Sequence, residues 1–459
     1  QSGGLTDAQF AANSQQSLRN RNWMGTPWNL IALKLNGRWS PKVTTSITLF
    51  GLYGERNSVG FTAAPTVIDA INLTTLQYAN RQVDRDRYVN YGIESRNIWN
   101  YTLGKKEHHL AFGLRVYQAK TNRKQRGTGT TGSDFDYSVS SAYPRDLDFT
   151  TQNVAAFAEN LFQITSNWSV TPGVRFEHIQ SEGSGIFNRV NGVITPFANQ
   201  TITRNQFLLG VGSEYRIGST NFYANLTQAY RPVLFSDLTP PATTDVIDSN
   251  LKDANGHTFD LGYRGTYKNW ANFDVSYFYM AYNNRIGTVN RYTNDDPTQA
   301  AYAYRTNLGK SIHRGFEIYT DVSWFDVFGL GKKWGKLKTF VSSAFIHARY
   351  SDFQTTTVSG TAPNTVITTT NLAGKRVENA PSFIHNFGIS WEYKKISVSV
   401  QQRQNSAVYT DATNTETPTA NGVNGKIGGY KVVDLGMEYR FKNYNLKAGI
   451  NNLLNENYA

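Results

Sequence analysis

The feature that most constrains this chain is a two-residue alternation of apolar and polar side chains that recurs along the sequence. In residues 433–441 (VDLGMEYRF), Leu435 and Met437 fall on one face and Glu438 falls on the other. The same alternation is found in residues 110–117, 207–217, 259–268 and 316–324. A period of two residues is typical of β-strands with two different faces. A one-residue slip would reverse both faces, so the pattern also predicts the register.

The expected strands run about 11 to 16 residues, whereas strands of soluble proteins usually run about 5 to 6. Such a length fits a tilted strand that crosses a membrane. The connections between the strands alternate between short and long. The short ones include 40–42, 165–167, 218–219, 394–395, Asn269 and Asn443, with 325–336 somewhat longer. The long ones are 56–86, 123–149, 183–204, 231–256, 284–302, 351–380 and 408–429.

This alternation of connections predicts an all-β fold, a transmembrane antiparallel up-and-down β-barrel with short periplasmic turns and long extracellular loops. We count about 16 strands. Residues 1–459 are expected to form one domain. Residues 28–40 end in a short turn and run downward, and the strand that begins near Tyr444 runs upward. With an even strand number and both ends periplasmic, we expect the barrel to be incomplete at both ends.

The composition fits a membrane barrel. Among 459 residues, 27 are Tyr and 26 are Phe, and these rings suit a boundary between apolar and wet surroundings. No apolar run approaches 18 residues, which argues against a transmembrane helix but not against a barrel. Cysteine is absent, which excludes disulfides and thiolate metal sites. The net charge of +12 is compatible with nucleic acid, anionic lipid or an anionic ligand.

No motif points to catalysis or to a bound metal. The glycine-rich residues 127–132 lack the Lys-Ser/Thr pair of a phosphate-binding loop. His108 and His109 are adjacent on a strand and face opposite sides, so they cannot share one metal ion. We therefore expect neither an enzyme nor a directly bound metal. Because the basic excess forms no continuous stripe, nucleic acid is not expected as a partner.

The basic residues divide into two groups. Lysines cluster in the short turns, where solvation accounts for them. Arginines occur in the long connections, where they could bind a carboxylate ligand with two hydrogen bonds each or form ion pairs between loops. The candidate ligand-binding residues are Arg56, Arg81, Arg85, Arg123, Arg126 and Arg291, and Arg305 is a further arginine of these connections.

Several short stretches resemble TonB-dependent outer-membrane receptors, and they occur in the order found in that family. They are residues 151–160 (TQNVAAFAEN), 171–177 (TPGVRFE), 230–238 (YRPVLFSDL), 313–317 (HRGFE) and 451–458 (NNLLNENY). Within the family, residues 3–10, 21–23, 27–29 and 374–381 are similar to the ferric dicitrate receptor group. In residues 374–381, Glu378 and Asn379 replace the Pro-Tyr pair of that group.

The resemblance implies an outer-membrane importer of a ferric chelate, ferric citrate or a similar anionic siderophore, in a Gram-negative bacterium. Iron would be carried as a chelate rather than as a protein-bound cofactor. Outer-membrane lipid and a TonB-type energy-coupling protein, acting through an N-terminal plug, would be the partners. Plugged transporters of this class have 22 strands, so the sequence would cover about 16 of them, with the plug and the final strand absent. The alternatives are a barrel subunit of a surface or secretion-associated complex and a passive porin.

Overall fold

The computed structural model describes residues 4–233, 246–419 and 424–458. Residues 234–238 of the YRPVLFSDL stretch and Gly3 of the first similar stretch lie outside them. The chain divides into two compact units, chiefly residues 1–163 with 171–209 and residues 164–170 with 210–459, and strand β8 contributes to both. The first unit contains α1 (Asp7–Ala12), β1 (Trp23–Gly25), β2 (Trp28–Ser40), β3 (Val43–Gly60), β4 (Gln82–Leu103), β5 (Lys106–Thr128), β6 (Arg145–Gln163), most of β7 (Trp168–Val190) and the first part of β8 (Val193–Ile217).

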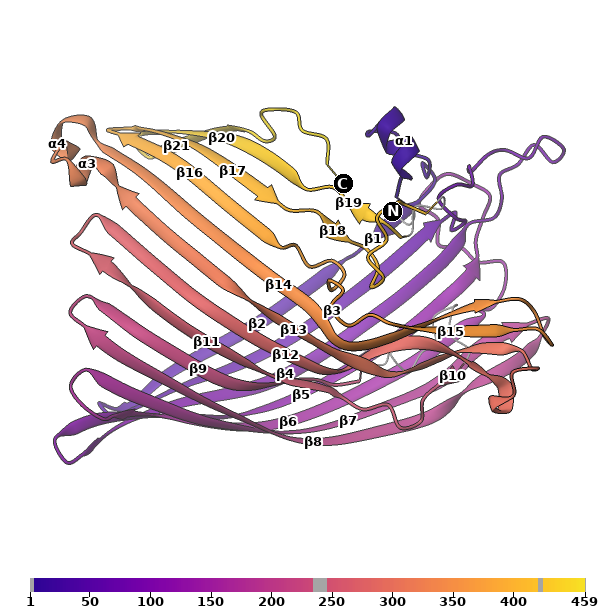
Figure 1. The fold of residues 1–459 in the computed structure, drawn as a ribbon, viewed down its shortest axis with the longest axis horizontal. Coiled ribbons are helices and arrows are strands. Elements are labelled where there is room, and N and C mark those ends of the chain that lie inside the picture. The colour runs from indigo at the N-terminus through magenta and orange to yellow at the C-terminus, as the bar shows by residue number, and fades with distance from the viewer. Residues whose placement is uncertain (1–3, 234–245, 420–423, 459) are drawn as a thin grey trace. The chain divides into compact units, whose positions relative to one another are not determined.

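The second unit continues the antiparallel pattern (Figure 1). Its long strands are β9 (Thr220–Arg231), β11 (Ala254–Tyr267), β12 (Ala271–Tyr292), β13 (Ala301–Ser323), β14 (Lys336–Ser359), β16 (Phe383–Tyr393), β17 (Ile396–Asn405), β20 (Tyr430–Phe441) and β21 (Tyr444–Ile450). Its short elements are β10 (Val246–Ile247), η1 (Thr293–Asp295), α3 (Trp324–Val327), α4 (Gly331–Trp334), β15 (Val366–Asn371), β18 (Val408–Tyr409) and β19 (Lys426–Ile427).

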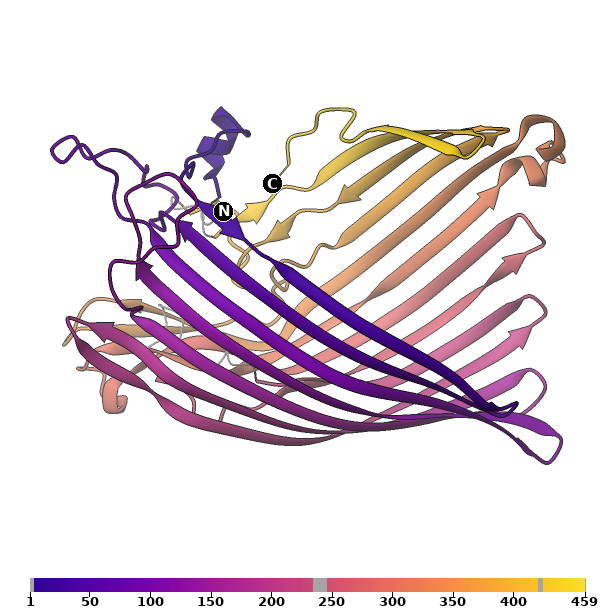
Figure 2. The ribbon, with the colours of Figure 1, turned by 180° about the vertical axis from the view of Figure 1, so that it is seen from behind.

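Long strands pair with their neighbours along the chain. In the first unit, β2, β3, β4, β5 and β6 form successive antiparallel ladders, which can be followed in Figure 2. In the second unit, the ladder runs from the end of β8 through β9, β11, β12, β13, β14, β16, β17 and β20 to β21. Apart from the five short strands β1, β10, β15, β18 and β19, the described residues form sixteen strands, which confirms the expected count. No described helix is long and apolar enough to span a membrane.

The strands are longer than the sequence predicted, reaching 22 residues in β4 and 25 in β8. The expected loop 183–204 is instead a continuous hairpin, in which β7 and β8 are joined by Asn191 and Gly192, both at positive φ. The predicted loop 56–86 is likewise shorter in the structure, at residues 61–81, because β3 extends to Gly60 and β4 begins at Gln82. The apolar alternation ends before the strands do. Backbone hydrogen bonding continues beyond it, because a strand surrounded by water can have polar side chains on both faces.

The short turns are confirmed, and they depend on left-handed backbone conformations. Lys268, Lys394 and Lys442 adopt φ of 50°, 54° and 51°. Glycine occupies the equivalent turns at Gly104 and Gly218, with φ of 65° and 57°. Two-residue connections of this kind match the right-handed twist of the flanking strands. They therefore help to set the register of the strand pairs that they join, such as β16 with β17 and β20 with β21.

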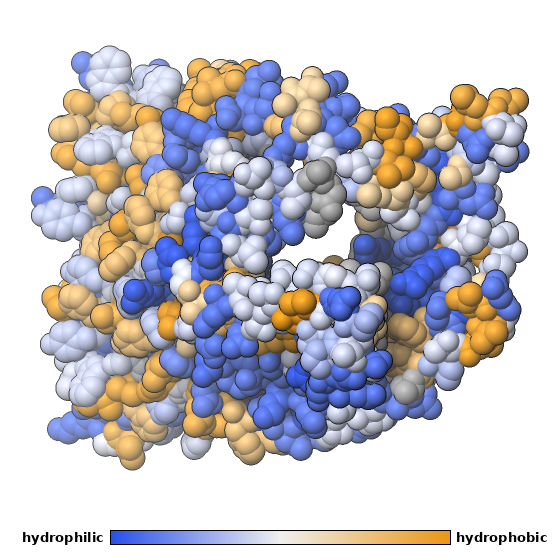
Figure 3. Space-filling view, turned by 45° about the vertical axis from the view of Figure 1, so that its right-hand side comes forward, coloured by the Kyte–Doolittle hydropathy of each residue, from blue (hydrophilic) through white to orange (hydrophobic). Residues whose placement is uncertain are grey.

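The ladders define two faces, which we call the apolar face and the polar face. In the first unit, one row of directly paired residues on the apolar face consists of Leu49, Ile93, Val116 and Val154. In the second unit, the corresponding rows include Phe222, Tyr263, Val275 and Ile318. Figure 3 shows apolar side chains gathered over part of the surface and separate areas that are strongly hydrophilic.

The predicted register is confirmed by these rows. Arg216 and Arg264 both form ion pairs with Glu214 on the polar face, at 2.9 and 3.6 Å. The polar face also carries Glu317, Asp434 and Glu438. The residues expected to face lipid all lie on the apolar face: Phe207, Leu209, Val211, Phe259, Leu261, Tyr263, Leu435 and Met437. That the chain is one domain, and that the complete barrel has 22 strands, stay predictions.

Substituting arginine on the two faces of β17 should have opposite consequences for stability. Val400 faces Ile389 and Leu435 on the apolar face, whereas Gln401 faces Asp434 on the polar face. Both lie roughly 10 Å above the short turn, near the middle of the membrane band. We expect Val400→Arg to lower the free energy of unfolding of the complete receptor in lipid vesicles by ~2–4 kcal/mol. Gln401→Arg is the matched control and should cost far less; equal costs in a urea titration would contradict the assignment of faces.

Candidate functional site

The candidate site lies where the strands of the first unit extend beyond the membrane. Asp86 is far along β4 from Leu103 at the short-turn end, a distance of roughly 40 Å along the membrane normal at ordinary strand rise and tilt. The apolar band of an outer-membrane barrel is about 25 Å tall. Arg56, Asp86 and Arg123 form one row across β3, β4 and β5 on the polar face. The row is therefore well above the band.

Asp86 is the buried centre of this row. Its side chain is 3% exposed and accepts a hydrogen bond from Nε of Arg123 at 3.4 Å. Tyr88 donates from its hydroxyl to the same carboxylate at 3.3 Å. Burial raises the pKa of Asp86, and the positive charges of Arg123 and Arg56 oppose that rise. Asp86 thus holds Arg123 in place while neutralising part of the local positive charge.

Two further arginines complete what we call the arginine cluster: Arg56, Arg123, Arg126 and Arg145. Arg145 is buried, donates from Nε to the carbonyl of Phe187 at 3.2 Å, and lies over the Phe187 ring at 4.6 Å. Burial, followed by repulsion from Arg126 and Arg123, lowers the pKa of Arg145 to about 10. Arg145 is paired across the ladder with Gln125, which lies between Arg123 and Arg126 in β5, and Arg56 is paired with Asp86.

The arginine cluster has fewer carboxylates than guanidinium groups. Asp84 accepts a hydrogen bond from the backbone nitrogen of Arg126 at 2.8 Å, and Asp86 binds Arg123. Among the described residues, this part of the polar face thus has four arginines and two aspartates. An excess of guanidinium groups outside the membrane attracts anions. Arginine suits carboxylate and phosphate groups because its planar fork can donate two parallel hydrogen bonds.

A second basic site, which we call the basic cavity, is found within the second unit. It has a volume of about 400 Å³ and none of its described lining residues is acidic. Its lining residues come from β9, β12 and β13: Arg231, Met280, Tyr282, Arg285, Ile286, Arg305 and His313. A β-bulge between Tyr282 and Ile286 turns Arg285 toward this cavity. The cavity could therefore also receive an anionic group.

Arg285 forms an ion pair with Glu378. Its Nη2 lies 2.7 Å from the Glu378 carboxylate, to which the Tyr350 hydroxyl also donates. Tyr350 is 2% exposed and packs with Leu372. Burial and the hydrogen bond to Glu378 raise the pKa of Tyr350 far above its usual value, so this hydroxyl remains a donor. Glu378 and Tyr350 thereby fix the position of Arg285 in the wall of the basic cavity.

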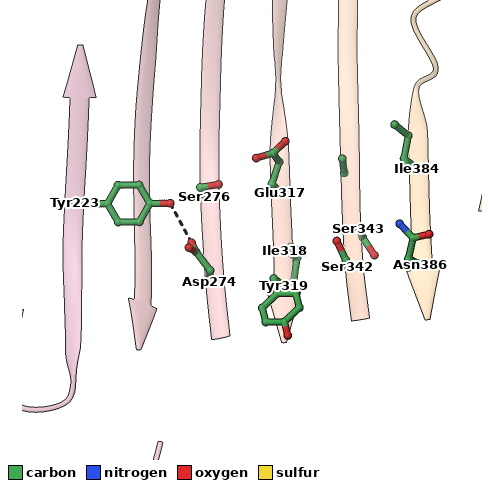
Figure 4. A pocket seen from close by; sticks show the side chains of 11 residues that line it. Tyr223, Asp274, Ser276, Glu317, Ile318, Tyr319, Ser342, Ser343, Ile384 and Asn386 are labelled. Carbon is green, nitrogen blue, oxygen red and sulfur yellow. Dashed lines mark hydrogen bonds between the residues drawn. The ribbon is translucent and has the colours of Figure 1, made fainter. Parts of the chain in front are cut away.

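A third hollow lies lower on the polar face of the second unit and has a different character (Figure 4). Its volume is about 310 Å³, and Tyr223 donates to Asp274 at 3.0 Å across it. Ser276, Glu317 and Asn386 also line it. Carboxylates and hydroxyls dominate here, in contrast to the basic cavity. This wall suits water and hydrated solutes better than an anion.

The structure separates the six arginines predicted from the sequence. Arg56, Arg123 and Arg126 come together in the arginine cluster. Arg85 lies on the opposite face of the same ladder, over the Tyr137 ring at 5.5 Å and 3.9 Å from Glu55.

The remaining two are engaged with the protein. Arg81 has a side chain with no exposed surface, and it donates to the carbonyls of Arg21 and Asp134. Burial lowers the pKa of Arg81. In the second unit, Arg291 stacks on the ring of Tyr304 at 3.8 Å. Whether any of the six contacts a ligand stays a prediction.

The expected placement of these arginines in loops is wrong for five of the six. Arg56 is in β3, Arg85 in β4, Arg123 and Arg126 in β5, and Arg291 in β12. The apolar alternation ends before these arginines, so the sequence pattern alone indicates loops there. The ladder continues in water without an apolar face, so they are carried on paired backbone instead.

Sequence reasoning missed Arg145, Arg231 and Arg285 as candidate residues, and it named Arg305 only as an arginine of the connections. Arg145 begins a short alternation, Arg145-Asp146-Leu147-Asp148, which could have indicated a strand. Nothing in the sequence marks the bulge that directs Arg285. The described residues contain no group of three or more His, Cys, Asp or Glu side chains arranged to hold a metal ion.

A two-faced antiparallel ladder of membrane-crossing length, with basic side chains on the polar face beyond the band, defines the class of outer-membrane β-barrels. Residues 2–453 match the family described as TonB dependent receptor-like, beta-barrel. The chain therefore belongs to the TonB-dependent receptor β-barrel family, whose barrels lie in the outer membrane and whose members are transporters and receptors rather than enzymes.

Solved structures share this fold. The ferric citrate transporter FecA in its unliganded form is 21% identical, with 99% of this chain and 60% of that chain covered and a TM-score of 0.74. The siderophore receptor PiuA from Acinetobacter baumannii is 14% identical, with 95% and 61% covered and a TM-score of 0.69. The copper transporter OprC is 15% identical, with 94% and 60% covered and a TM-score of 0.66. The chain thus spans about 60% of the length of these proteins.

Removing the negative charge at the centre of the arginine cluster should strengthen anion binding there. Asp86→Asn keeps the size of the side chain but leaves Arg56 and Arg123 without their shared carboxylate. At neutral pH we expect the complete receptor to bind a carboxylate-rich anion about tenfold more tightly, measured by calorimetry at low salt. Asp148→Asn is the matched control, since Asp148 is exposed on the opposite face of β6. A loss of affinity in Asp86→Asn alone would show that Asp86 contacts the ligand's cation or a hydroxyl.

Proposed function

We propose that this chain is the barrel portion of a receptor that imports an anionic ferric chelate, ferric citrate or a similar anionic siderophore, across the outer membrane of a Gram-negative bacterium. The observation that carries the proposal is the excess of arginine on the polar face above the membrane band. Family membership and the sequence similarity to ferric dicitrate receptors support the same reading. The fold alone does not decide the cargo, since it is shared with a ferric citrate transporter and with a copper transporter.

The chemistry of the cargo suits this surface. A ferric chelate with free carboxylates carries negative charge distributed over several oxygens. Each guanidinium group can donate two hydrogen bonds to one carboxylate, which a lysine ammonium cannot match in geometry. Arg56, Arg123 and Arg126 are carried on β3 and β5 at fixed spacing. Binding would then fix the orientation of the chelate as well as its charge.

The basic cavity would provide a further group of donors of the same kind. Arg285 keeps its ion pair with Glu378, so this arginine would shape the cavity more than it binds cargo. Arg305 and Arg231 would face the anion. We propose that the iron stays within its chelate and that the protein contributes no bound cofactor.

Energy for import would come from a TonB-type coupling protein. Family membership supports this partner, which in plugged transporters acts on a plug inside the barrel. The barrel itself would perform no chemistry. Its contribution would be binding from the outside, a polar lumen and a lipid-facing exterior.

Uptake of radiolabelled ferric citrate by cells that carry the complete receptor tests the proposal. We expect uptake that requires an energised coupling protein and saturates with chelate concentration. A Cu²⁺ arm should give no coupled uptake. Coupled uptake of copper without ferric chelate would overturn the assigned cargo, and uptake independent of the coupling protein would favour a passive pore.

Single substitutions in the arginine cluster should weaken binding. We expect Arg123→Ala to reduce affinity for ferric citrate by ~1.5–3 kcal/mol, the value of a charge-assisted hydrogen bond. Calorimetry on the purified complete receptor measures this. Arg87→Ala is the matched control, because Arg87 is exposed on the opposite face of β4, over the Tyr53 ring at 5.1 Å. Unchanged affinity in the single variants of all six sequence-predicted arginines would reject that assignment.

A further inference from the structure

Three basic side chains lie together on the apolar face of the second unit, where lipid is expected. Arg314 of β13 and His347 of β14 are directly paired across the ladder, and Arg349 is two residues beyond His347. Nε of Arg349 lies 3.2 Å from Nε2 of His347. All three side chains are exposed, whereas Ala348 and Tyr350, on the other face of β14, are buried. We call these three residues the lipid-face cluster; its positive charge comes from Arg314 and Arg349, since Nε2 of His347 accepts a hydrogen bond from Arg349.

The two arginines of the lipid-face cluster differ from several arginines of the polar face in having no acidic partner among the described residues. On the polar face, Arg264 pairs with Glu214 and Arg403 pairs with Asp434. Among the described residues, no carboxylate lies within ion-pair distance of Arg314 or Arg349; Arg349 donates only to His347 and to the carbonyl of Gly374. Uncompensated charge at the edge of the hydrocarbon region is costly. An anion supplied from outside the protein would remove that cost.

Their height matches the outer boundary of the membrane. From the short-turn ends of β13 and β14, Ser323 and Lys336, the paired residues lie roughly 25 Å up along the membrane normal. That equals the height of the apolar band, about 25 Å. Lipid headgroups begin at this level. The charge is therefore beside phosphate groups rather than beside acyl chains.

An aromatic groove lies directly below the charges. Its volume is about 430 Å³, and its upper end is formed by Arg314 and His347. Tyr277 and Phe316 are in contact at 5.3 Å between ring centroids, and Phe345 also lines the groove. Phe316 and Phe345 are 54% and 47% exposed, so the groove can accept an apolar chain. The charged end of the groove is thus above its apolar part, which matches an outer-leaflet lipid with its headgroup above its acyl chains.

We propose that Arg314, His347 and Arg349 bind the phosphate of an outer-leaflet lipid, with one of its acyl chains in the groove formed by Tyr277, Phe316 and Phe345. The guanidinium of Arg314 donates to the phosphate from β13, and Arg349 donates from the other side of His347. The lipid supplies the negative charge that this face lacks. The site depends on membrane embedding and not on the identity of the cargo.

Native mass spectrometry of the complete receptor with bisphosphorylated lipid A and with its dephosphorylated form tests the site. We expect the wild-type protein to retain the bisphosphorylated lipid and to bind the dephosphorylated form at least tenfold more weakly. The double variant Arg314→Gln/Arg349→Gln should lose about tenfold in affinity for the phosphorylated lipid only. Equal binding of both lipids by the wild type would overturn the proposal.

Two controls separate the alternatives. Arg87→Gln removes an exposed arginine on the corresponding face of the first unit, but well above the band, and should leave lipid binding unchanged. Wild-type levels of heat-resistant folded barrel on electrophoresis establish that the double variant has folded. Inorganic phosphate in excess should not displace the lipid, because the acyl chain contributes to binding. Displacement by inorganic phosphate would show a site for the free anion and overturn the lipid assignment.

Discussion

The whole structure depends on the requirement that backbone N–H and C=O groups find partners where no water is present. Each unsatisfied group in hydrocarbon costs several kcal/mol. The antiparallel ladders meet this requirement between neighbouring strands, as in the long pairing of β12 with β13. The ladder fixes which residues stand opposite one another, and the two faces follow from it. One such row contains Phe222, Tyr263 and Val275, whose backbones are paired across the ladder. Their side chains are apolar because this face is in contact with lipid.

Sequence reasoning captured what this requirement imposes on side chains inside the membrane. Leu435 against Glu438, or Leu261 against Arg264, could be assigned to opposite faces because the lipid boundary enforces a period of two. Short turns such as the one at Lys442 could be located because little else fits between two such runs. The number of crossing strands followed from the same signals.

The structure of the region above the membrane was much less predictable from the sequence. There, β4 and β5 continue as a ladder with water on both sides, so composition no longer distinguishes one face from the other. Arg85 and Arg123 therefore looked alike as residues of long connections, although they lie on opposite faces. The β-bulge beside Arg285 and the burial of Arg81 depend on contacts between distant segments. The local sequence pattern therefore predicts neither the bulge nor the burial of Arg81.

The extension of paired strands beyond the lipid has a thermodynamic consequence for recognition. Arginines on a flexible loop lose conformational freedom when they close around a ligand, and that loss subtracts from affinity. Arg123, held by Asp86 on a ladder that is already formed, has little such freedom left to lose. The receptor would therefore discriminate between chelates by the spacing of their carboxylates more than by total charge. A small, rigid chelate of matching spacing would be favoured over a larger, flexible one of equal charge.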